Sequence, residues 1–312
     1  MRILDDAAVA KATPWTGLAE ALRTRLAQPI ESPPRMVLDP TGRADALMVM
    51  PAWRAGGAMV VKLVTVYPRE SPALDGVVVA FDEATGKVSA VLDGMAITNR
   101  RTAAAAALGS SLLARRGASR LLVIGTGALA GPLIQAHRAI CGVRQVAVWG
   151  RNADRAAAVA AREGAEVARD LDAAIAAADI VAAATTTAMP LLAAASVRPG
   201  THLTLVGAFT PAMAEAEPAL MGRCALIYAD DRASVLAKGG EVFQAIRAGI
   251  IPEEAVRGGL AELCAAPPSR PDEAITVFKT VGFAALDLIA TELALAGLAL
   301  AGLALTAAPT SA

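Results

Sequence analysis

Hydrophobic and polar positions follow two different patterns along the chain. Between residues 35 and 93, short apolar runs succeed one another with only turn-forming residues such as Thr41-Gly42 and Asp75-Gly76 between them. The runs cover 35–38, 46–53, 59–66, 77–82 and 88–93. Short valine-rich runs separated by turns predict a mostly antiparallel sheet. A short strand at 1–4 and a helical segment up to about residue 28 are expected before it.

From residue 120 onward, apolar runs alternate with segments in which apolar residues recur at helical spacing. This alternation is typical of βαβ units and predicts an α/β domain with a parallel sheet. The expected strands cover 120–124, 145–149, 165–168, 180–184, 201–207 and 226–230, with helices at 153–163 and 171–177. Because ligands bind beyond the carboxyl ends of parallel strands, the residues after 180–184 and 201–207 are expected to face a ligand.

Two further helices are expected outside these regions. An alanine-rich helix over about 99–116 places Arg100 and Arg101 in its first turn, where the helix dipole disfavours cations. An anionic ligand would account for that placement. The apolar segment 283–305 contains Asp287 and Glu292, so it predicts a buried or subunit-interface helix rather than a membrane anchor.

The first run of the α/β region ends in Gly125-Thr126-Gly127 and continues as a helix. Gly125 would allow a tight turn, Gly127 would let the backbone approach a pyrophosphate, and Ala130 would let helix and strand pack closely. An isolated glycine pattern can be no more than a turn. The helix and the second apolar run that follow at the right distance favour a dinucleotide site.

The residues after the second run bear on the choice of dinucleotide. NAD sites usually carry an acidic residue here, whereas this chain has Gly150-Arg151-Asn152, with Arg155 one turn later. A guanidinium can bind a 2′-phosphate that a carboxylate would repel, so NADPH is favoured over NADH. The alternative is that Arg151 is a solvated residue at the start of the next helix.

Composition excludes several other classes of protein. Lys plus Arg equals Asp plus Glu at 29 each, so no bulk charge points to nucleic acid or an acidic membrane. The three cysteines are far apart and indicate neither a disulfide framework nor a zinc site, as expected of a reduced, cytoplasmic compartment. Charged residues interrupt the start, so no signal peptide is expected. His137 and His202 are expected to be structural, and Asp230-Asp231 lacks further metal ligands.

Several motifs together are similar to a known family. They are Met50-Pro51-Ala52, Lys62, Phe81-Asp82 with Thr85-Gly86, Arg101-Thr102-Ala103-Ala104, Gly125-Thr126-Gly127, Trp149-Gly150-Arg151, Gly207-Ala208 with Pro211 and Glu215, and Phe278-Lys279-Thr280-Val281-Gly282 with Asp287. In this order, and over nearly the whole chain, they resemble the ornithine cyclodeaminase/μ-crystallin family.

That resemblance implies a fold and an assembly. It implies a Rossmann domain, here 117–277, and an α+β substrate-binding and dimerisation domain formed by 1–116 and completed by the C-terminal helix within 278–312. It further implies a homodimer built by the N-terminal sheet, with catalysis in the cleft between the domains.

The resemblance also assigns a substrate clamp. Arg35, Lys62 and Arg101 match positions that surround the substrate's carboxylate in the family, and three converging cations suit an anion. Each has an ordinary alternative as a solvent-facing or paired surface residue.

One departure from the family pattern decides between its reactions. Cyclodeaminases of the family carry an Asp in the loop where this chain has Phe209, within Gly207-Ala208-Phe209-Thr210-Pro211. Phenylalanine cannot accept a proton or orient an ammonium group, which disfavours loss of ammonia. The loop resembles that of the family's ketimine reductases, which reduce Δ1-pyrroline-2-carboxylate to proline and Δ1-piperideine-2-carboxylate to pipecolate.

The sequence therefore predicts an NAD(P)H-dependent oxidoreductase acting on a small cyclic imine carboxylate. Ornithine cyclodeaminase, an alanine-dehydrogenase-like enzyme and a non-enzymatic crystallin-like protein remain alternatives. The proton donor is either Lys62 or a water, and no metal is expected. The predicted catalytic residues are Lys62, Arg35, Arg101 and Thr210, of which Thr210 would hold the nicotinamide or a water. The predicted contacts of NADPH or NADH are Gly125, Thr126, Gly127, Ala128, Leu129, Arg151, Asn152, Thr185, Thr186, Ala208 and Phe209.

Overall fold

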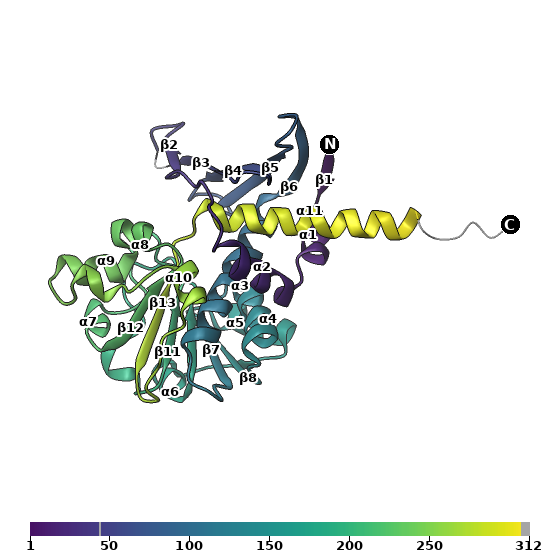
Figure 1. The fold of residues 1–312 in the computed structure, drawn as a ribbon. Coiled ribbons are helices and arrows are strands. Elements are labelled where there is room, and N and C mark those ends of the chain that lie inside the picture. The colour runs from purple at the N-terminus through teal and green to yellow at the C-terminus, as the bar shows by residue number, and fades with distance from the viewer. Residues whose placement is uncertain (44, 307–312) are drawn as a thin grey trace. The chain divides into compact units, whose positions relative to one another are not determined.

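The computed structural model describes residues 1–43 and 45–306, and their side chains as far as residue 298. Its contacts divide the chain into two compact units (Figure 1). Unit 1 comprises Met1–Arg101 and Phe283–Ala312, and unit 2 comprises Thr102–Gly282. The fold class is the predicted one, a parallel α/β domain together with an α+β domain.

Unit 1 is built on a six-stranded sheet in the order β1-β6-β5-β4-β3-β2. Its strands are β1 (Arg2–Leu4), β2 (Met36–Leu38), β3 (Ala46–Trp53), β4 (Met59–Val66), β5 (Leu74–Phe81) and β6 (Val88–Asp93). Neighbours from β2 to β6 are antiparallel, and β1 joins β6 in parallel. Its helices are α1 (Asp6–Ala12), α2 (Trp15–Arg25) and α11 (Ala284–Thr306).

Side-chain alternation gives this sheet two different faces. In β4, Val60, Lys62 and Val64 are buried, whereas Val61 and Leu63 between them are only half-buried. The helix α11 contacts β3, β4 and β5, so it covers the buried face. A lysine on that face needs a partner, because an isolated charge is costly to bury.

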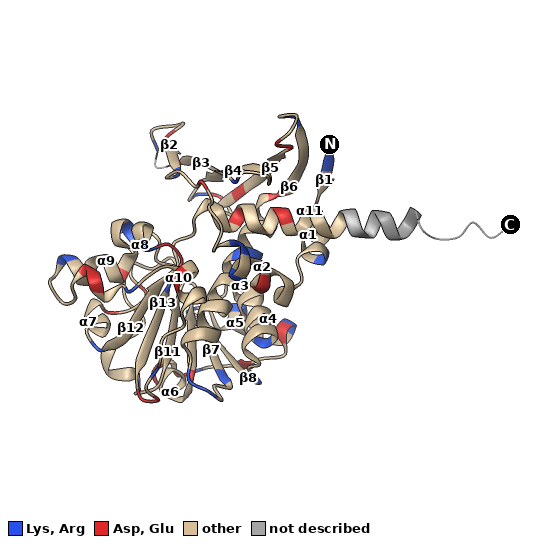
Figure 2. Ribbon diagram, viewed as in Figure 1, with Lys and Arg blue, Asp and Glu red and all other residues tan. Residues whose placement is uncertain are grey.

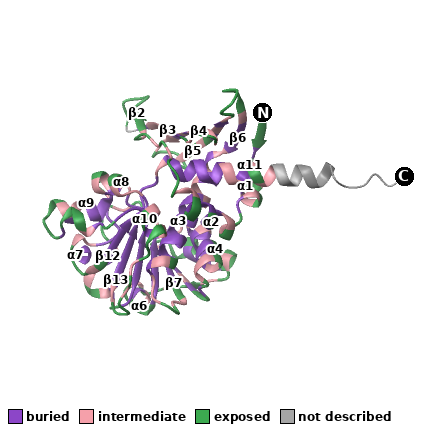
Figure 3. Cartoon of the chain, viewed as in Figure 1, coloured by how far each residue is buried: buried purple, intermediate pink, exposed green. Residues whose placement is uncertain are grey.

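Unit 2 contains a parallel seven-stranded sheet in the order β12-β13-β11-β10-β7-β8-β9. The strands are β7 (Arg120–Ile124), β8 (Gln145–Trp149), β9 (Glu166–Val167), β10 (Ile180–Ala183), β11 (His202–Leu205), β12 (Cys224–Ala229) and β13 (Ile275–Lys279). The helices are α4 (Ala130–Cys141), α5 (Ala153–Glu163), α6 (Leu171–Ala177), α7 (Pro218–Met221), α8 (Arg232–Lys238), α9 (Gly240–Arg247) and α10 (Leu260–Ala265), with short 3-10 turns at Ala194–Ser196 and Glu253–Ala255. The central strands are buried on both faces (Figure 3), which explains their continuous apolar runs.

The helix α3 (Gly94–Leu113) begins earlier than the predicted 99–116. Asp93 caps it, because its Oδ1 accepts hydrogen bonds from the backbone N–H of Met95 and Ala96, each at 2.8 Å. Arg100 and Arg101 therefore lie in the second turn, and the dipole argument for an anion at this helix was wrong. The Arg100 guanidinium instead stacks 4.0 Å from the centre of the Trp15 ring.

The division into units also differs from the boundaries drawn from the sequence. The residues 278–279, assigned above to the first domain, belong to β13, which lies between β11 and β12 in the sheet of unit 2. The later part of α3 belongs to unit 2 as well. A Cβ at Gly109 would lie 2.5 Å from the Phe278 ring, so only glycine lets this helix pack so closely on β13.

Candidate functional site

The glycine turn between β7 and α4 has the geometry of a phosphate-binding turn. Gly125 has a φ of +125°, and a Cβ there would lie 2.6 Å from the Ala184 carbonyl oxygen. A Cβ at Gly127 would meet nothing within 4 Å, so the backbone here is open to a ligand. Ala130, where α4 begins, is buried against the sheet. The residues present therefore fit a pyrophosphate at the helix N-terminus.

The strand order places this turn where a dinucleotide binds in folds of this kind. On one side of β7 lie β8 and β9, and on the other lie β10 and β11. The connections therefore diverge beyond the carboxyl ends of β7 and β10, which is a topological switch point.

The segment after β8 lies directly beside the turn. A Cβ at Gly150 would be 2.5 Å from Thr126 Cγ2, so Gly150 packs closely against the turn. Arg151 is the next residue in the chain. Arg151 is exposed, and no ion pair within the described residues involves it. The Asn152 side chain caps α5 by accepting the Arg155 N–H at 2.9 Å. The Asn152 Oδ1 atom therefore caps a helix, a structural role that was not considered when Asn152 was predicted to contact the cofactor.

Loops after β10 and β11 bring the other predicted cofactor contacts together. A Cβ at Gly207 would lie 1.9 Å from the Thr185 carbonyl oxygen, so the two loops touch through their backbones. Phe209 is half-buried against the hydrophobic core of unit 2, and Thr210 is half-buried beside it. Ala208 is fully buried and Thr186 is exposed.

In unit 1, α11 supplies a carboxylate to the two buried cations of the predicted clamp. Lys62 Nζ lies 2.7 Å from Asp287 Oδ2, and Arg101 Nε lies 2.9 Å from Asp287 Oδ1. Lys62 Nζ also donates to Thr98 Oγ1 at 3.3 Å. The other acidic residue of the described part of α11, Glu292, pairs with Arg25 and Arg54, and acidic positions of this helix are red in Figure 2. Lys62, Arg101 and Asp287, called the clamp cluster below, are all buried.

The clamp cluster carries a net positive charge at neutral pH. Burial lowers the pKa of Lys62 to about 8 against the opposing effect of Asp287, with Arg101 and Arg35 also lowering it. Burial acts to raise the pKa of Asp287, but Arg101 and Lys62 together hold it below its usual value. Two cations thus share one anion, and Arg35 is close enough to be felt by Lys62. An anion is the ligand that such a cluster attracts.

The orientation of Arg101 favours a carboxylate in particular. Its ion pair with Asp287 uses Nε, so Asp287 does not engage the terminal nitrogens, Nη1 and Nη2. These terminal nitrogens can form two parallel hydrogen bonds to a carboxylate. Sequence reasoning gave Asp287 no role of its own. The signal that could have found it is a carboxylate within the strongly apolar run 283–305.

Other polar residues singled out from the sequence have structural contacts. His137 and His202 are buried in unit 2, where both bond to hydroxyl groups. Asp230 accepts the backbone N–H of Gly282 at 2.7 Å, and Asp231 caps α8. Within residues 1–43 and 45–306, no group of three or more His, Cys, Asp or Glu side chains is placed to hold a metal ion. No helix in this described part is long and apolar enough to cross a membrane.

Comparisons with known proteins agree with the motifs. The model of the ornithine cyclodeaminase/mu-crystallin family matches residues 6–295. A Δ1-pyrroline-2-carboxylate reductase of Paracoccus denitrificans is 37% identical over 287 residues, covering 88% of this chain and 90% of that protein. The ketimine reductase mu-crystallin of Mus musculus is 32% identical over 268 residues, covering 84% and 83%.

Solved structures show the same fold. The Δ1-pyrroline-2-carboxylate reductase of Thermococcus litoralis, solved with NADH and L-proline, superposes with a TM-score of 0.90. It is 23% identical and covers 97% of this chain and 98% of that one. By sequence motifs, fold and family match, the chain belongs to the ornithine cyclodeaminase/μ-crystallin family.

Proposed function

We propose that this chain is an NAD(P)H-dependent reductase of cyclic ketimine carboxylates, converting Δ1-pyrroline-2-carboxylate to L-proline and Δ1-piperideine-2-carboxylate to L-pipecolate. The observation that carries the proposal is the side chain at position 209. The cyclodeaminases place a carboxylate there, whereas Phe209 packs against the core of unit 2 and has no group that could handle an amine. Relatives named as reductases of such imines, at 37% and 32% identity, support the same reaction.

The clamp cluster supplies what this substrate needs. The Nη1 and Nη2 atoms of Arg101 would bind the carboxylate, with Arg35 adding positive charge nearby. Asp287 holds both Arg101 and Lys62 in place, so the clamp is ordered before the substrate arrives. Fixing a small ring by its carboxylate limits its rotation. Positioning of this kind lowers the activation free energy by at most about 7–11 kcal/mol.

A proton must also reach the imine nitrogen. Lys62 is protonated at neutral pH, because its pKa of about 8 lies above 7. A lysine whose pKa is this close to the working pH is a better proton donor than an ordinary exposed one. The bound dihydronicotinamide would supply the hydride to the imine carbon. Lys62 would supply the proton to nitrogen, which leaves a neutral ring amine.

Cofactor binding would use the glycine turn, with NADPH preferred to NADH. The open backbone at Gly127 and the start of α4 would take the pyrophosphate. Arg151, exposed and without an ion pair among the described residues, would meet the 2′-phosphate. The loops carrying Thr185, Thr186, Ala208, Phe209 and Thr210 would contact the nicotinamide end.

We also propose a homodimer formed through the sheet of unit 1. On the face opposite α11, Pro51, Val61, Val79 and Val91 stand side by side across four strands. All four are half-buried, so they form a continuous apolar surface that remains partly exposed. Surfaces of this kind favour association with a second chain.

The proposal is tested by following NADPH oxidation, and separately NADH oxidation, with Δ1-pyrroline-2-carboxylate, beside an assay for ammonia release from ornithine. Rapid oxidation without ammonia is expected. Proline and ammonia from ornithine without added reductant would instead show a cyclodeaminase. Arg101→Ala should abolish turnover with cofactor affinity nearly unchanged. Arg100→Ala removes the neighbouring cation, which contacts Thr13 and Trp15, and should retain turnover.

A further inference from the structure

A single buried carboxylate in unit 2 joins the loops that follow β10 and β11. Glu215 Oε1 accepts the Thr185 backbone N–H at 2.7 Å and the Thr185 hydroxyl at 3.1 Å. Glu215 Oε2 accepts the backbone N–H of Gly207 at 2.6 Å and of Ala208 at 3.3 Å. The side chain is fully buried. Backbone bonds also join these segments, from Val206 N–H to the Ala183 carbonyl at 2.9 Å and from Ala214 N–H to the Thr187 carbonyl at 3.0 Å. Between these two bonds, the Glu215 side chain bonds to both loops just after the strands end.

The four contacts of Glu215 suit an ionised carboxylate, and the backbone bonds from Thr185 and Gly207 oppose burial, which raises its pKa. All four groups around Glu215 are hydrogen-bond donors, and a carboxylate accepts through both oxygens. A glutamine of the same shape would turn an NH₂ group toward one of the two loops, leaving donor facing donor. Because the Gly207 and Thr185 backbones already touch, there is no space for a compensating side chain.

A second buried ion pair, between Glu241 and Lys279, contacts the backbone of Glu215. Glu241, in α9, accepts the Glu215 backbone N–H at 3.1 Å through Oε2, and its Oε1 lies 2.7 Å from Lys279 Nζ. All three side chains are fully buried. Lys279 pairs with Glu241 and also lowers the pKa of Glu215, whereas burial and Glu241 raise it. The N–H and O–H groups of the loops supply the remaining stabilisation of the Glu215 charge. This arrangement is costly to build, since unpaired buried charge is strongly disfavoured.

We propose that Glu215 is a positioning residue for the nicotinamide end of the cofactor. It acts through Thr185 and through the Gly207–Ala208 backbone, and it touches neither cofactor nor substrate. The inference rests on the proposed function, because these loops carry the residues assigned there to the nicotinamide. The adenine end would instead be held by the glycine turn and Arg151, to which Glu215 makes no hydrogen bond.

The two ends of the cofactor give a direct test. Affinities are measured calorimetrically for NADPH and for 2′-phospho-ADP-ribose, which lacks the nicotinamide. Glu215→Gln should weaken NADPH about tenfold or more and lower kcat by about 10²-fold, since misplacement of about 1 Å costs that much. Its affinity for 2′-phospho-ADP-ribose should stay within about twofold of wild type.

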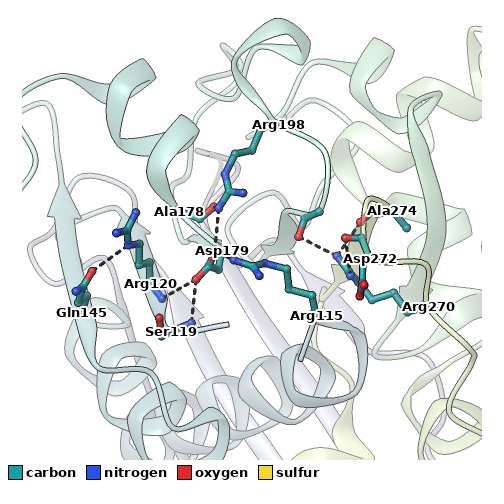
Figure 4. A network of polar contacts seen from close by, with 11 residues as sticks. Arg115, Ser119, Arg120, Gln145, Ala178, Asp179, Arg198, Arg270, Asp272 and Ala274 are labelled. Atoms are coloured by element: carbon teal, nitrogen blue, oxygen red, sulfur yellow. Dashed lines mark hydrogen bonds and ion pairs between the residues drawn. The ribbon is translucent and has the colours of Figure 1, made fainter. Parts of the chain in front are cut away.

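Asp179→Asn is the matched control. Asp179 is also a buried carboxylate in unit 2, but it lies at the amino ends of the strands (Figure 4). It accepts the backbone N–H of Ser119 at 2.9 Å and of Arg120 at 3.1 Å, and it pairs with Arg115 and Arg198. Its amide variant should lower stability while both affinities stay at the wild-type value.

Two results would overturn the inference. One is an E215Q enzyme that binds NADPH and turns over like wild type. The other is an equal loss for NADPH and for 2′-phospho-ADP-ribose, which would mean a general structural role. Glu215→Asp keeps the charge with a shorter reach, and it provides the same comparison if E215Q does not fold. A wild-type protein that binds neither ligand would instead refute the proposed cofactor site itself.

Discussion

At the scale of single residues, Asp287 joins two cations that are separate in the sequence into one buried cluster. Lys62 and Arg101 are far apart in the chain, and the ordinary alternatives were a solvent-facing Lys62 and an Arg101 paired with a neighbouring acid. The structure buries both against one carboxylate of α11. A buried charge persists only with a partner, so the three residues form one unit whose charge state is coupled.

This coupling predicts a pH dependence. If protonated Lys62 is the proton donor, kcat/KM falls as the pH rises through about 8. Asp287 opposes the effect of burial on the pKa of Lys62. In Asp287→Asn the pKa of Lys62 should therefore fall further, and the loss of activity should begin at lower pH. Profiles of kcat/KM against pH for both proteins measure this, and a descending limb at the same pH in both would contradict it.

A second prediction concerns Arg151. Arg151→Glu should lower kcat/KM with NADPH by about 10-fold or more, because a charge-assisted hydrogen bond is worth about 1.5–3 kcal/mol. The value with NADH should stay unchanged or rise. Arg144→Glu, at an exposed position before β8, gives the control, and equal losses with both cofactors in R151E would count against the assignment.

At the scale of elements, a buried hydrogen-bond chain ties α3 and α4 to the sheet of unit 2. His137 Nδ1 donates to the Leu133 carbonyl, and its Nε2 meets Ser110 at 3.0 Å. Ser110 contacts Thr204, whose hydroxyl lies 3.0 Å from His202 Nε2. Thr276 donates to the Leu113 carbonyl and so accepts from His202 Nδ1. Burial favours the neutral form of both histidines.

This chain should make the fold sensitive to acid. Burial lowers the pKa of His137 from 6.5 to about 4 and that of His202 to about 3. Below pH 6.5 the histidines of the unfolded chain take up protons, whereas those of the folded chain do not. The free energy of unfolding therefore decreases as the pH decreases, by up to about 1.4 kcal/mol per pH unit for each histidine. Urea unfolding from pH 7 to 5 measures this. His137→Gln should show a shallower decline, and an unchanged slope would refute the account.

At the scale of the whole molecule, the proposed dimer depends on the open face of the unit 1 sheet. Val61→Glu places a charge in the row formed by Pro51, Val79 and Val91. We expect the variant to be a monomer by light scattering where the wild type is a dimer, because burying an unpaired charge in an interface is costly. Val167→Glu, at an exposed position in β9, should leave the wild-type mass. A dimeric V61E protein would argue against this interface.

Much of the architecture could be predicted from the sequence, because it depends on local pattern. The strands 46–53, 59–66 and 88–93 were predicted with the ends that the structure shows. Valine-rich alternation and turn residues encode them within a few positions of the chain. The glycine turn was recognisable for the same reason, since the positive φ of Gly125 is a local property that favours glycine.

The start of α3 at Gly94, the place of β13 in the sheet and the partners of the buried charges could not be predicted in this way. The start of α3 depends on Asp93. In the sequence, this residue fits the end of the strand 88–93 as well as it fits a helix N-cap. The positions of Asp287 beside Lys62 and of Glu215 between Thr185 and Gly207 follow from contacts between segments far apart in the chain.

The sequence by itself therefore determined the fold class, the family and the residue types available for chemistry. Only the tertiary structure decided which carboxylate meets which cation or loop. The reason is physical: backbone conformation responds to neighbouring residues, whereas the cost of a buried charge is met by whichever partner the packed core brings within hydrogen-bonding distance.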